Sequence, residues 1–293
     1  SELNNIQSLK CNKFDNIQKA ISFYLSSMED TKIHSACFAT AGTVHLDTFK
    51  LANNHWTINK SDVASVLKDV DINWINDFTA QALATTTLTD SDVAVINKGI
   101  AKPEKLRLVI GPGTGLGVCG LVMTKSGWVP IAGEGGHSDF APNTKLEFEI
   151  LTLLTKKFGH VAVERILSGP GILNLYEALC QIKGVDITFK SPSDITAAAV
   201  SKDSNPIAEE TIQMFCKIFG SVAGSMALTM GALGGVYITS DLVRNFLELF
   251  IDSDFQQSFE NKGRLKPVME NIPIYLSKKE NMGLIGTVYQ LNN

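Results

Sequence analysis

The sequence predicts a mixed α/β fold of two packed lobes, from two alternating hydrophobic patterns and from the length of the chain. Short apolar runs that end at glycine are typical of buried strands, and apolar residues three or four positions apart are typical of helices. Both patterns occur along the whole chain. Its 293 residues are enough for a large core and for two domains.

The first part of the chain alternates between the two patterns. Residues 14–25 have apolar side chains at positions 14, 17, 21 and 24, which form one face of a helix. KIHSACFATAG (32–42) predicts a buried strand closed by a glycine turn, and VDINWINDF (70–78) predicts a strand leading into a helix from Thr79. Further strands are predicted at LRLVI (106–110), GVCGLVM (117–123) and WVPI (128–131).

Capping signals define the helices of the second part. Thr144 and Glu147 fit a capping box, which opens a helix through ILTLLTKKF. Asn205 is a predicted N-cap with Pro206 at the first helical position, and that helix continues to about Met230. GGVYITS (234–240) predicts a strand, and a short helix from about Gly283 ends the chain. Residues 185–204 are expected to be connecting structure.

Composition excludes several classes of function. The net charge of −4, with 19% charged and 44% hydrophobic residues, is ordinary for a soluble globular protein and argues against a nucleic-acid or membrane-surface partner. No run approaches the roughly 18 apolar residues of a membrane span. The five cysteines are scattered without a CxxC pair, which favours reduced core thiols in a cytosolic protein.

The glycine-rich stretch GPGTGLGVCG (111–120) is a candidate phosphate-binding loop. A Walker A loop needs a Gly-Lys pair, and the chain has none. Gly115, Gly117 and Gly120 match the spacing of a dinucleotide fingerprint, but that fingerprint opens a helix and these glycines lead into a strand. With both of these loops excluded, the stretch is predicted to be a β-hairpin turn. Its backbone amides and the Thr114 hydroxyl could bind an anion, or it could be a tight turn without a ligand.

Polar residues with possible roles in binding or catalysis occur at three other places. Asn76 and Asp77 follow an apolar strand, where α/β sheets present ligand-binding groups, although Asp77 could instead cap the helix from Thr79. Glu134 and His137 lie in a glycine-rich segment without a second histidine or cysteine nearby, so a polyhydroxylated ligand suits them better than a metal. Glu164 alone is weak evidence, because a glutamate at a helix end is usually solvated.

Together these stretches resemble the bacterial glucokinases, an ATP-dependent, hexokinase-like family without a zinc motif. The CxCGxxGC-type cluster of the repressor-related sugar kinases, which share the fold, is absent from the sequence. The resemblance extends over nearly the whole chain and rests on INDFTA (75–80), GPGTGLGV (111–118), GEGGHSDFAP (133–142), GHVAVERILSGPGILNLYEAL (159–179), GGVYI (234–238) and FENKGR (259–264).

The resemblance implies an actin-like ATPase (ribonuclease H-like) fold, with a small and a large α/β domain around a cleft. The small domain is expected at residues 1–86 with 278–293, and the large domain at 87–277. The implied reaction transfers the γ-phosphoryl group of ATP, with Mg²⁺, to the 6-hydroxyl of glucose at the entry to glycolysis. The family also implies a cytoplasmic homodimer, whereas the choice among glucose, mannose and glucosamine stays open.

The resemblance also implies roles for individual residues. Asp77 matches the catalytic base that takes the proton of the sugar 6-hydroxyl. Gly113, Thr114 and Gly115 match the second phosphate loop, and Thr239 lies in the adenosine-binding turn. No metal ligands are expected from the protein, because Mg²⁺ binds with the nucleotide. The implied contacts to sugar hydroxyls are Asn53, Asn76, Glu134, His137 and Glu164.

Two departures from the family pattern affect the nucleotide side. The first phosphate hairpin, of the form D-x-G-G-T-N-x-R, is missing ahead of Ser1, so we expect the intact protein to be longer and to supply the aspartate that organises Mg²⁺. Thr239-Ser240-Asp241 replaces A-G-G in the adenosine-binding turn, and the side chains at 240 and 241 are expected to crowd the nucleotide and weaken its binding. A catalytically impaired sugar sensor or regulatory protein is the alternative to a kinase. Asp77 and the intact glycine loop favour the kinase.

Overall fold

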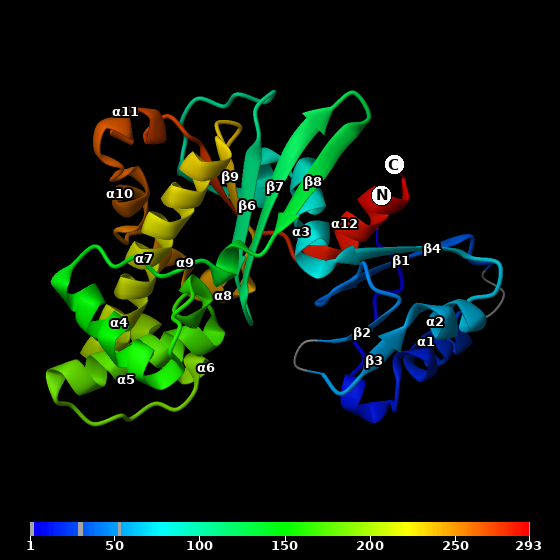
Figure 1. Ribbon diagram of the computed structural model, residues 1–293, viewed down its shortest axis with the longest axis horizontal. Coiled ribbons are helices and arrows are strands. Elements are labelled where there is room, and N and C mark those ends of the chain that lie inside the picture. The colour runs from blue at the N-terminus through cyan, green and yellow to red at the C-terminus, as the bar shows by residue number, and fades with distance from the viewer. Residues whose placement is uncertain (1–2, 29–31, 52–53, 293) are drawn as a thin grey trace. The chain divides into compact units, whose positions relative to one another are not determined.

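The computed structural model describes residues 3–28, 32–51 and 54–292 (Figure 1). Contacts between Cα atoms divide the chain into two units. Unit 1 comprises Ser1–Thr87 with Asn281–Asn293, and unit 2 comprises Leu88–Glu280. The two ends of the chain therefore contribute to the same unit.

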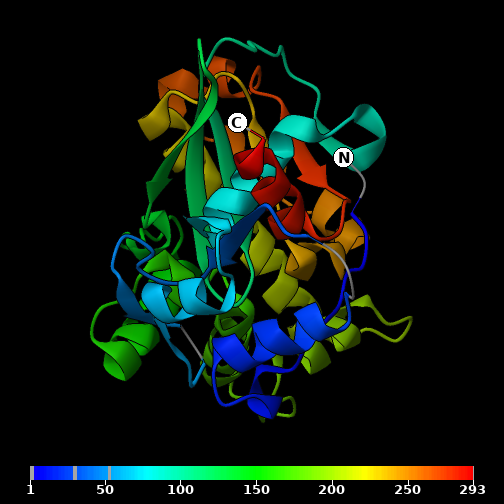
Figure 2. The same cartoon turned by 90° about the vertical axis from the view of Figure 1, so that its right-hand side faces the viewer.

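The described residues of unit 1 form two small sheets and four α-helices. Strands β1 (Ser35–Thr40) and β4 (Asp71–Asn76) pair in parallel, and β2 (Thr48–Lys50) and β3 (Thr57–Asn59) pair antiparallel. The helices are α1 (Ile17–Ser26), α2 (Lys60–Val66), α3 (Asp77–Ala84) and α12 (Met282–Leu291), with 3₁₀ turns at Cys11–Lys13 and Thr85–Thr87. Figure 2 shows α1 in blue and α2 in cyan, which pack together.

Aromatic side chains build the core of unit 1. The ring of Trp74 stacks on Phe38 with centroids 4.6 Å apart and meets Phe49 edge to face at 5.9 Å. Helices α3 and α12 touch backbone to backbone, because a Cβ at Gly286 would lie 1.7 Å from the carbonyl oxygen of Ala80. The predicted first helix, the strands at 32–42 and 70–78, and the C-terminal helix are all confirmed.

Unit 2 is built on a six-stranded sheet in the order β5-β10-β9-β6-β7-β8. The three central neighbours β10, β9 and β6 are parallel, whereas β6, β7 and β8 form an antiparallel meander and β5 pairs antiparallel with β10. The strands are β5 (Val93–Asn97), β6 (Arg107–Pro112), β7 (Leu116–Thr124), β8 (Gly127–Gly133), β9 (Val236–Ile238) and β10 (Ile274–Ser277). The predicted strands at 106–110, 117–123, 128–131 and 234–240 are thus confirmed.

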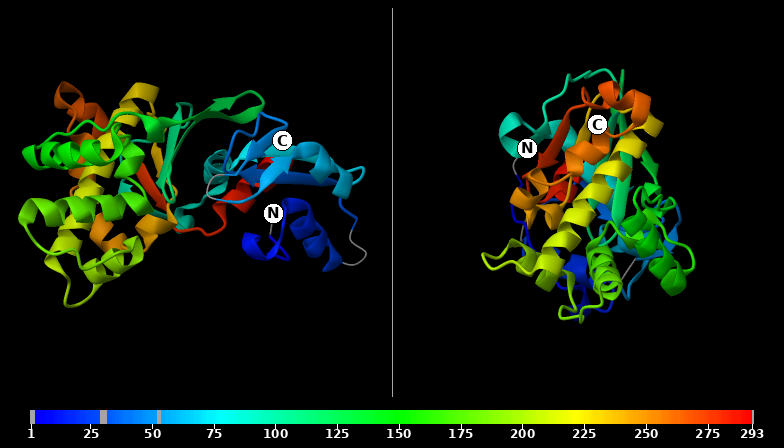
Figure 3. Two further views of the ribbon diagram at one scale, coloured as in Figure 1. Left: turned by 60° about the horizontal axis from the view of Figure 1, so that its bottom comes forward. Right: turned by 90° about the vertical axis from the view of Figure 1, so that its left-hand side faces the viewer.

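Helices and 3₁₀ turns complete unit 2, and the left view of Figure 3 shows its helices grouped on one side of the sheet. The α-helices are α4 (Lys145–Phe158), α5 (Gly169–Lys183), α6 (Pro192–Val200), α7 (Pro206–Met230), α8 (Asp241–Arg244), α9 (Leu247–Ile251), α10 (Phe255–Glu260) and α11 (Lys266–Met269). The 3₁₀ turns are η3 (Asp90–Asp92), η4 (Gly135–His137), η5 (Val163–Arg165) and η6 (Gly263–Leu265).

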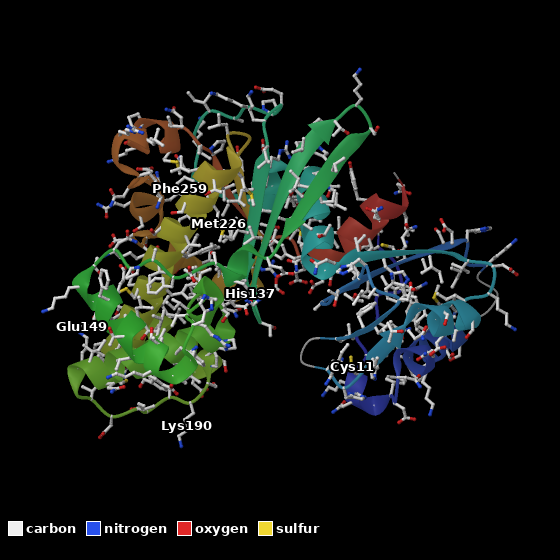
Figure 4. The ribbon with its side chains drawn as sticks, in the orientation of Figure 1. Cys11, His137, Glu149, Lys190, Met226 and Phe259 are labelled. Atoms are coloured by element: carbon white, nitrogen blue, oxygen red, sulfur yellow. The ribbon has the colours of Figure 1, made fainter. Side chains whose placement is uncertain are left out.

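Helix α7 is the central helix of the unit 2 core. Asn205 caps it by accepting hydrogen bonds from the amides of Ile207 and Ala208, as the sequence predicts. By length and composition it could cross a membrane, but 61% of that apolar window is buried inside the protein. Helix α10 packs closely on it, because a Cβ at Gly224 would lie 2.5 Å from the carbonyl oxygen of Phe259. Figure 4 labels Met226 on α7 and Phe259 on α10.

Three local expectations need correction. Helix α3 begins at Asp77 rather than Thr79, because the Asn76 side chain supplies the cap. The segment 185–204 is not only connection, since it contains α6, which buries Ile195 in the core. Thr144 caps α4 as expected, but the Glu147 carboxylate accepts from the amide of Asn143, one residue before the position that a capping box uses.

Three of the five cysteines, Cys119, Cys180 and Cys216, are buried as the sequence predicts, and Cys11 and Cys37 are half-buried. All five lie in the described part of the chain, and each is free. Burial raises the pKa of the Cys37 thiol to about 11, and the pKa of Cys119 and of Cys216 to about 12. These thiols therefore stay protonated near neutral pH.

Candidate active site

The carboxyl end of β4 places Asn76 and Asp77 at the start of α3. Asn76 is the last residue of β4 and pairs with Thr40, the last residue of β1. Its Oδ1 accepts hydrogen bonds from the amides of Phe78 at 2.9 Å and Thr79 at 3.1 Å. Because Asn76 satisfies these amides, Asp77 is not needed as the helix cap, and that alternative interpretation is wrong.

The Asp77 carboxyl group lies in a partly desolvated position. It is half-buried, and its Oδ1 accepts a hydrogen bond from the amide of Phe78 at 2.8 Å. Burial raises the pKa of Asp77, and the Phe78 hydrogen bond opposes part of that rise. A carboxylate with a raised pKa is a stronger base, which suits it to accept a proton from a hydroxyl group.

The glycine-rich stretch forms a β-hairpin turn, as predicted. Pro112 of β6 pairs with Leu116 of β7, and the turn between them consists of Gly113, Thr114 and Gly115. The amide of Gly113 donates to the carbonyl oxygen of Gly115 at 2.7 Å, and Thr114 is exposed. A dinucleotide-binding loop is excluded here, because residues 116–124 are a strand and not a helix.

Hydrogen bonds from three other segments hold this turn in place. The amide of Gly169 donates to the carbonyl oxygen of Gly113 at 2.8 Å. The Ser240 hydroxyl donates to the carbonyl oxygen of Pro112, and the amide of Leu116 donates to Oε2 of Glu164 at 2.8 Å. The base of the turn is therefore fixed on both strands, whereas its tip is open to solvent.

Glu134 and His137 lie at the two ends of a 3₁₀ turn that rests on β7. A Cβ at Gly136 would lie 2.3 Å from the carbonyl oxygen of Leu116, so only glycine permits this approach. The amide of His137 donates to the carbonyl oxygen of Glu134 at 2.9 Å. Both side chains are exposed, and Figure 4 labels His137 beside the strands of the sheet. They are thus available to a ligand.

Glu164 lies on η5, which is joined to the segment after His137. The amide of Val163 donates to the carbonyl oxygen of Ser138 at 2.9 Å, and the amide of Phe140 donates to that of Val161 at 3.0 Å. Glu164 is half-buried and bonded to the turn, so it is not the solvated helix-end side chain that its isolated position suggested. Unit 2 therefore brings Glu164, the Glu134–His137 turn and the glycine hairpin onto adjoining elements.

In the Thr239-Ser240-Asp241 segment, Thr239 and Ser240 are buried and Asp241 is exposed. Ser240 is 4% exposed, and its Oγ caps α8 by accepting from the amide of Val243 at 3.0 Å while it donates to Pro112. The exposed Asp241 carboxylate pairs with Arg244 at 2.5 Å, which balances its charge. The Ser240 side chain is thus directed into the protein, and the expected weakening of nucleotide binding stays a prediction.

Thr239 itself is buried beside the hairpin. Its amide donates to the carbonyl oxygen of Ile110 at 3.1 Å, and the residue is 4% exposed. Within the described residues its Oγ1 has no hydrogen-bond partner. A buried hydroxyl without a partner is uncommon in folded proteins, and a ligand could supply one.

The expected sugar contact Asn53 lies outside the described residues, so its position is not part of this site. Among the described residues, no group of three or more histidine, cysteine, aspartate or glutamate side chains could hold a metal ion. The hairpin nevertheless leaves room for a nucleotide phosphate, because apart from its two chain neighbours no described residue has an atom within 4 Å of a Cβ placed at Gly113.

Comparison with known proteins identifies the family. The family model described as Glucokinase matches residues 1–293. The chain belongs to the glucokinase family. It is 47% identical over 292 residues to a glucokinase of Hahella chejuensis, covering 100% of this chain and 90% of that relative. It is 41% identical over 288 residues to a glucokinase of Marinobacter nauticus, covering 98% of this chain and 89% of the relative.

Solved structures agree with the family assignment. The crystal structure of a glucokinase from an Antarctic psychrotroph matches with a TM-score of 0.86 at 31% identity, covering 98% of this chain and 89% of that one. A ROK family glucokinase from Streptomyces griseus, solved with glucose and AMPPNP, matches with a TM-score of 0.62 at 16% identity, covering 92% and 86%, and shows the shared fold. The protein is accordingly a hexose kinase, a phosphotransferase with the two-domain α/β ATPase fold, and its family uses ATP.

Proposed function

We propose that the protein phosphorylates the 6-hydroxyl of glucose with ATP and that Asp77 is the catalytic base. The observation that carries this proposal is the position of Asp77 after β4, half-buried and with a raised pKa, while Asn76 takes over the capping of α3. In the reaction, the glucose O6 forms a bond to the γ-phosphorus. The bond from that phosphorus to the bridging oxygen of ADP breaks, and the hydroxyl proton goes to the Asp77 carboxylate.

Sugar recognition is assigned to side chains that can pair with vicinal hydroxyls. Glu134 and Glu164 offer carboxylate oxygens, and His137 can donate or accept, so together they suit a hexose. This assignment is supported by the fold of unit 2, in which all three residues lie on adjoining elements. Asn53 and Asn76 are proposed as further hydroxyl contacts. The choice of glucose over other hexoses rests on the family.

Nucleotide binding is assigned to the hairpin of Gly113, Thr114 and Gly115 together with Thr239. The turn presents backbone amides at an exposed tip, and its glycines let phosphate oxygens approach closely. The buried Thr239 hydroxyl is available for a hydrogen bond near the base of the same hairpin. Mg²⁺, bound to the ATP phosphates, would neutralise their charge.

The domain division, the cellular location and the oligomeric state are also proposals. Unit 1 and unit 2 are proposed as the small and large domains, predicted at 1–86 with 278–293 and at 87–277, and the contact division supports this. A cytoplasmic location is supported by the five free cysteines and by the family. The proposed homodimer rests on the family resemblance alone.

A coupled assay tests the proposal directly. Glucose 6-phosphate production is followed with glucose and MgATP, for this chain and for a version extended at its N-terminus with the hairpin of a relative. Turnover that depends on both substrates supports a glucokinase. If neither protein turns over while glucose still raises the melting temperature, the sugar-sensor alternative is correct.

A further inference from the structure

Glu164 connects two sites that the proposed function treats separately. Its side chain is assigned to the hexose, but Oε2 already accepts the amide hydrogen of Leu116, the first residue after the phosphate-binding turn. Oε1 has no hydrogen-bond partner among the described residues. One carboxylate therefore has one oxygen engaged by the turn and one available to a sugar hydroxyl.

The contact of Glu164 with the turn is steric as well as polar. A Cβ built on Gly115 would lie 2.4 Å from Oε2 and 3.1 Å from the Glu164 carboxyl carbon. The carboxylate thus rests directly on the Gly115 backbone. At Gly113, two residues earlier on the same turn, a Cβ would meet no described atom within 4 Å outside its two chain neighbours.

The segment that carries Glu164 is held by hydrogen bonds and contacts the turn at two places. Ser168 donates to the carbonyl oxygen of Glu164 at 2.8 Å and accepts from the amide of Gly171 at 3.0 Å, which ties η5 to the start of α5. At the beginning of α5, the amide of Gly169 donates to the carbonyl oxygen of Gly113 at 2.8 Å. Glu164 and Gly169 therefore hold opposite ends of the three-residue turn.

We infer that Glu164 is a positioning residue through which hexose binding and the geometry of the phosphate-binding turn are coupled. This inference rests on the proposed function, because it takes Oε1 as a hexose contact. A sugar hydroxyl on Oε1 fixes the rotation of the carboxylate, and the same carboxylate fixes the Leu116 amide and the Gly115 backbone. Since binding coupling is reciprocal, a change on either side must alter affinity on the other.

Substitutions at Gly115 and Gly113 form the first test. Gly115→Ala displaces the Glu164 carboxylate, whereas Gly113→Ala adds the same methyl group to the same turn without touching it. Glucose affinity is measured by calorimetric titration without nucleotide. We expect Gly115→Ala to weaken glucose binding by at least about five-fold, the lower end of typical coupling, and Gly113→Ala to leave it within about two-fold.

Substitutions at Glu164 test the reverse effect, that of a changed sugar contact on the binding of ATP. Glu134, a proposed sugar contact for which no bond to the turn is described, is the matched control. Glu164→Ala is expected to raise the KM for ATP at least about five-fold, whereas Glu134→Ala raises mainly the KM for glucose. Glu164→Gln retains an oxygen for the Leu116 amide and is expected to restore the KM for ATP to within about two-fold. Melting temperatures of all variants separate these effects from loss of folding.

The outcomes distinguish this inference from the proposed function. Equal glucose affinities for Gly115→Ala and Gly113→Ala, or an unchanged KM for ATP in Glu164→Ala, would overturn the coupling and leave Glu164 as a sugar contact only. If Glu164→Ala does not fold, the glycine pair still decides, because it leaves Glu164 in place. Lack of glucose phosphorylation by both the unmodified protein and its N-terminally extended version would instead contradict the proposed function, and the glucose titrations would still measure the coupling.

Discussion

The hydroxyl of Ser240 donates a hydrogen bond to the carbonyl oxygen of Pro112, across 128 positions of the chain. The same hydroxyl accepts from the amide of Val243, so it caps α8 and fastens that helix to the base of the hairpin between β6 and β7. The serine that departs from the glycine of the family pattern therefore has a structural role. Where glycine would leave the backbone of the turn flexible, Ser240 forms a hydrogen bond that joins β6 to α8.

Ser240→Ala should destabilise the protein by about 1 kcal/mol, because it leaves the buried Pro112 carbonyl without this donor and removes the cap of α8. Chemical denaturation measures the change in the free energy of unfolding. Ser225→Ala is the matched control, since its exposed hydroxyl bonds only within α7, and it should change stability by less than about 0.5 kcal/mol. Equal stabilities of the two variants would show that the Pro112 contact contributes little.

Ser240→Gly tests whether the departure weakens ATP binding. Because the serine side chain is directed into the protein, restoring the family's glycine should not lower the KM for ATP. A KM that falls several-fold in steady-state assays would show that the hydroxyl does crowd the nucleotide. The stability of this variant should fall as it does for Ser240→Ala, by about 1 kcal/mol, since both lose the hydrogen bond.

Asp77→Asn should reduce kcat by about 10²–10⁴-fold, because it removes the proton acceptor while keeping the shape of the side chain. Asn76 still caps α3 in this variant, so the helix should persist. Glucose affinity, measured by titration, should stay within a few-fold of the unmodified protein. Normal turnover by Asp77→Asn would remove Asp77 from the catalytic role.

The sequence predicts those parts of the fold and site that depend on neighbouring residues. The hairpin at 111–118 follows from glycines between two apolar runs, and the start of α7 follows from Asn205-Pro206. The bond from Leu116 to Glu164 joins residues 48 positions apart, so no local pattern indicates it. Its one signal in the sequence is Gly115, which the contact requires but which a tight turn would also explain.

Long-range packing also explains the missed elements. Strand β10 (Ile274–Ser277) lies between β9 and β5, but its four residues are too few for a clear period in the sequence. The glycines of the Glu134–His137 turn are explained only by their contact with β7, where Leu116 approaches Gly136. The sequence predicts that Asn76 and Asp77 lie at the end of a strand, but which of them caps α3 depends on side-chain geometry.

Gly286→Ala should destabilise unit 1 strongly. Its Cβ would lie 1.7 Å from the backbone oxygen of Ala80, and a backbone atom cannot move without separating α12 from α3. Overpacking of this kind typically costs about 1–3 kcal/mol or more. Gly283→Ala lies on the same helix, and its Cβ would meet no described atom within 4 Å, so it should be neutral or slightly stabilising. Thermal unfolding compares the two variants, and equal melting temperatures would contradict the close contact.

The pH dependence of stability should report the environment of Asp77. Burial raises its pKa in the folded state above the unfolded value, so the folded protein binds more protons between those two pKa values. Its contribution to stability is therefore present below the unfolded pKa of about 3.9 and is lost as the pH rises through the folded pKa.

Asp77→Asn removes this titration, since asparagine stays neutral. The variant should melt at a higher temperature than the unmodified protein at about pH 7.5, and the difference should narrow as the pH falls towards about 4.5. Thermal unfolding of the variant and of the unmodified protein is compared across this pH range. A difference between Asp77→Asn and the unmodified protein that stays constant with pH would show that burial does not raise the pKa of Asp77.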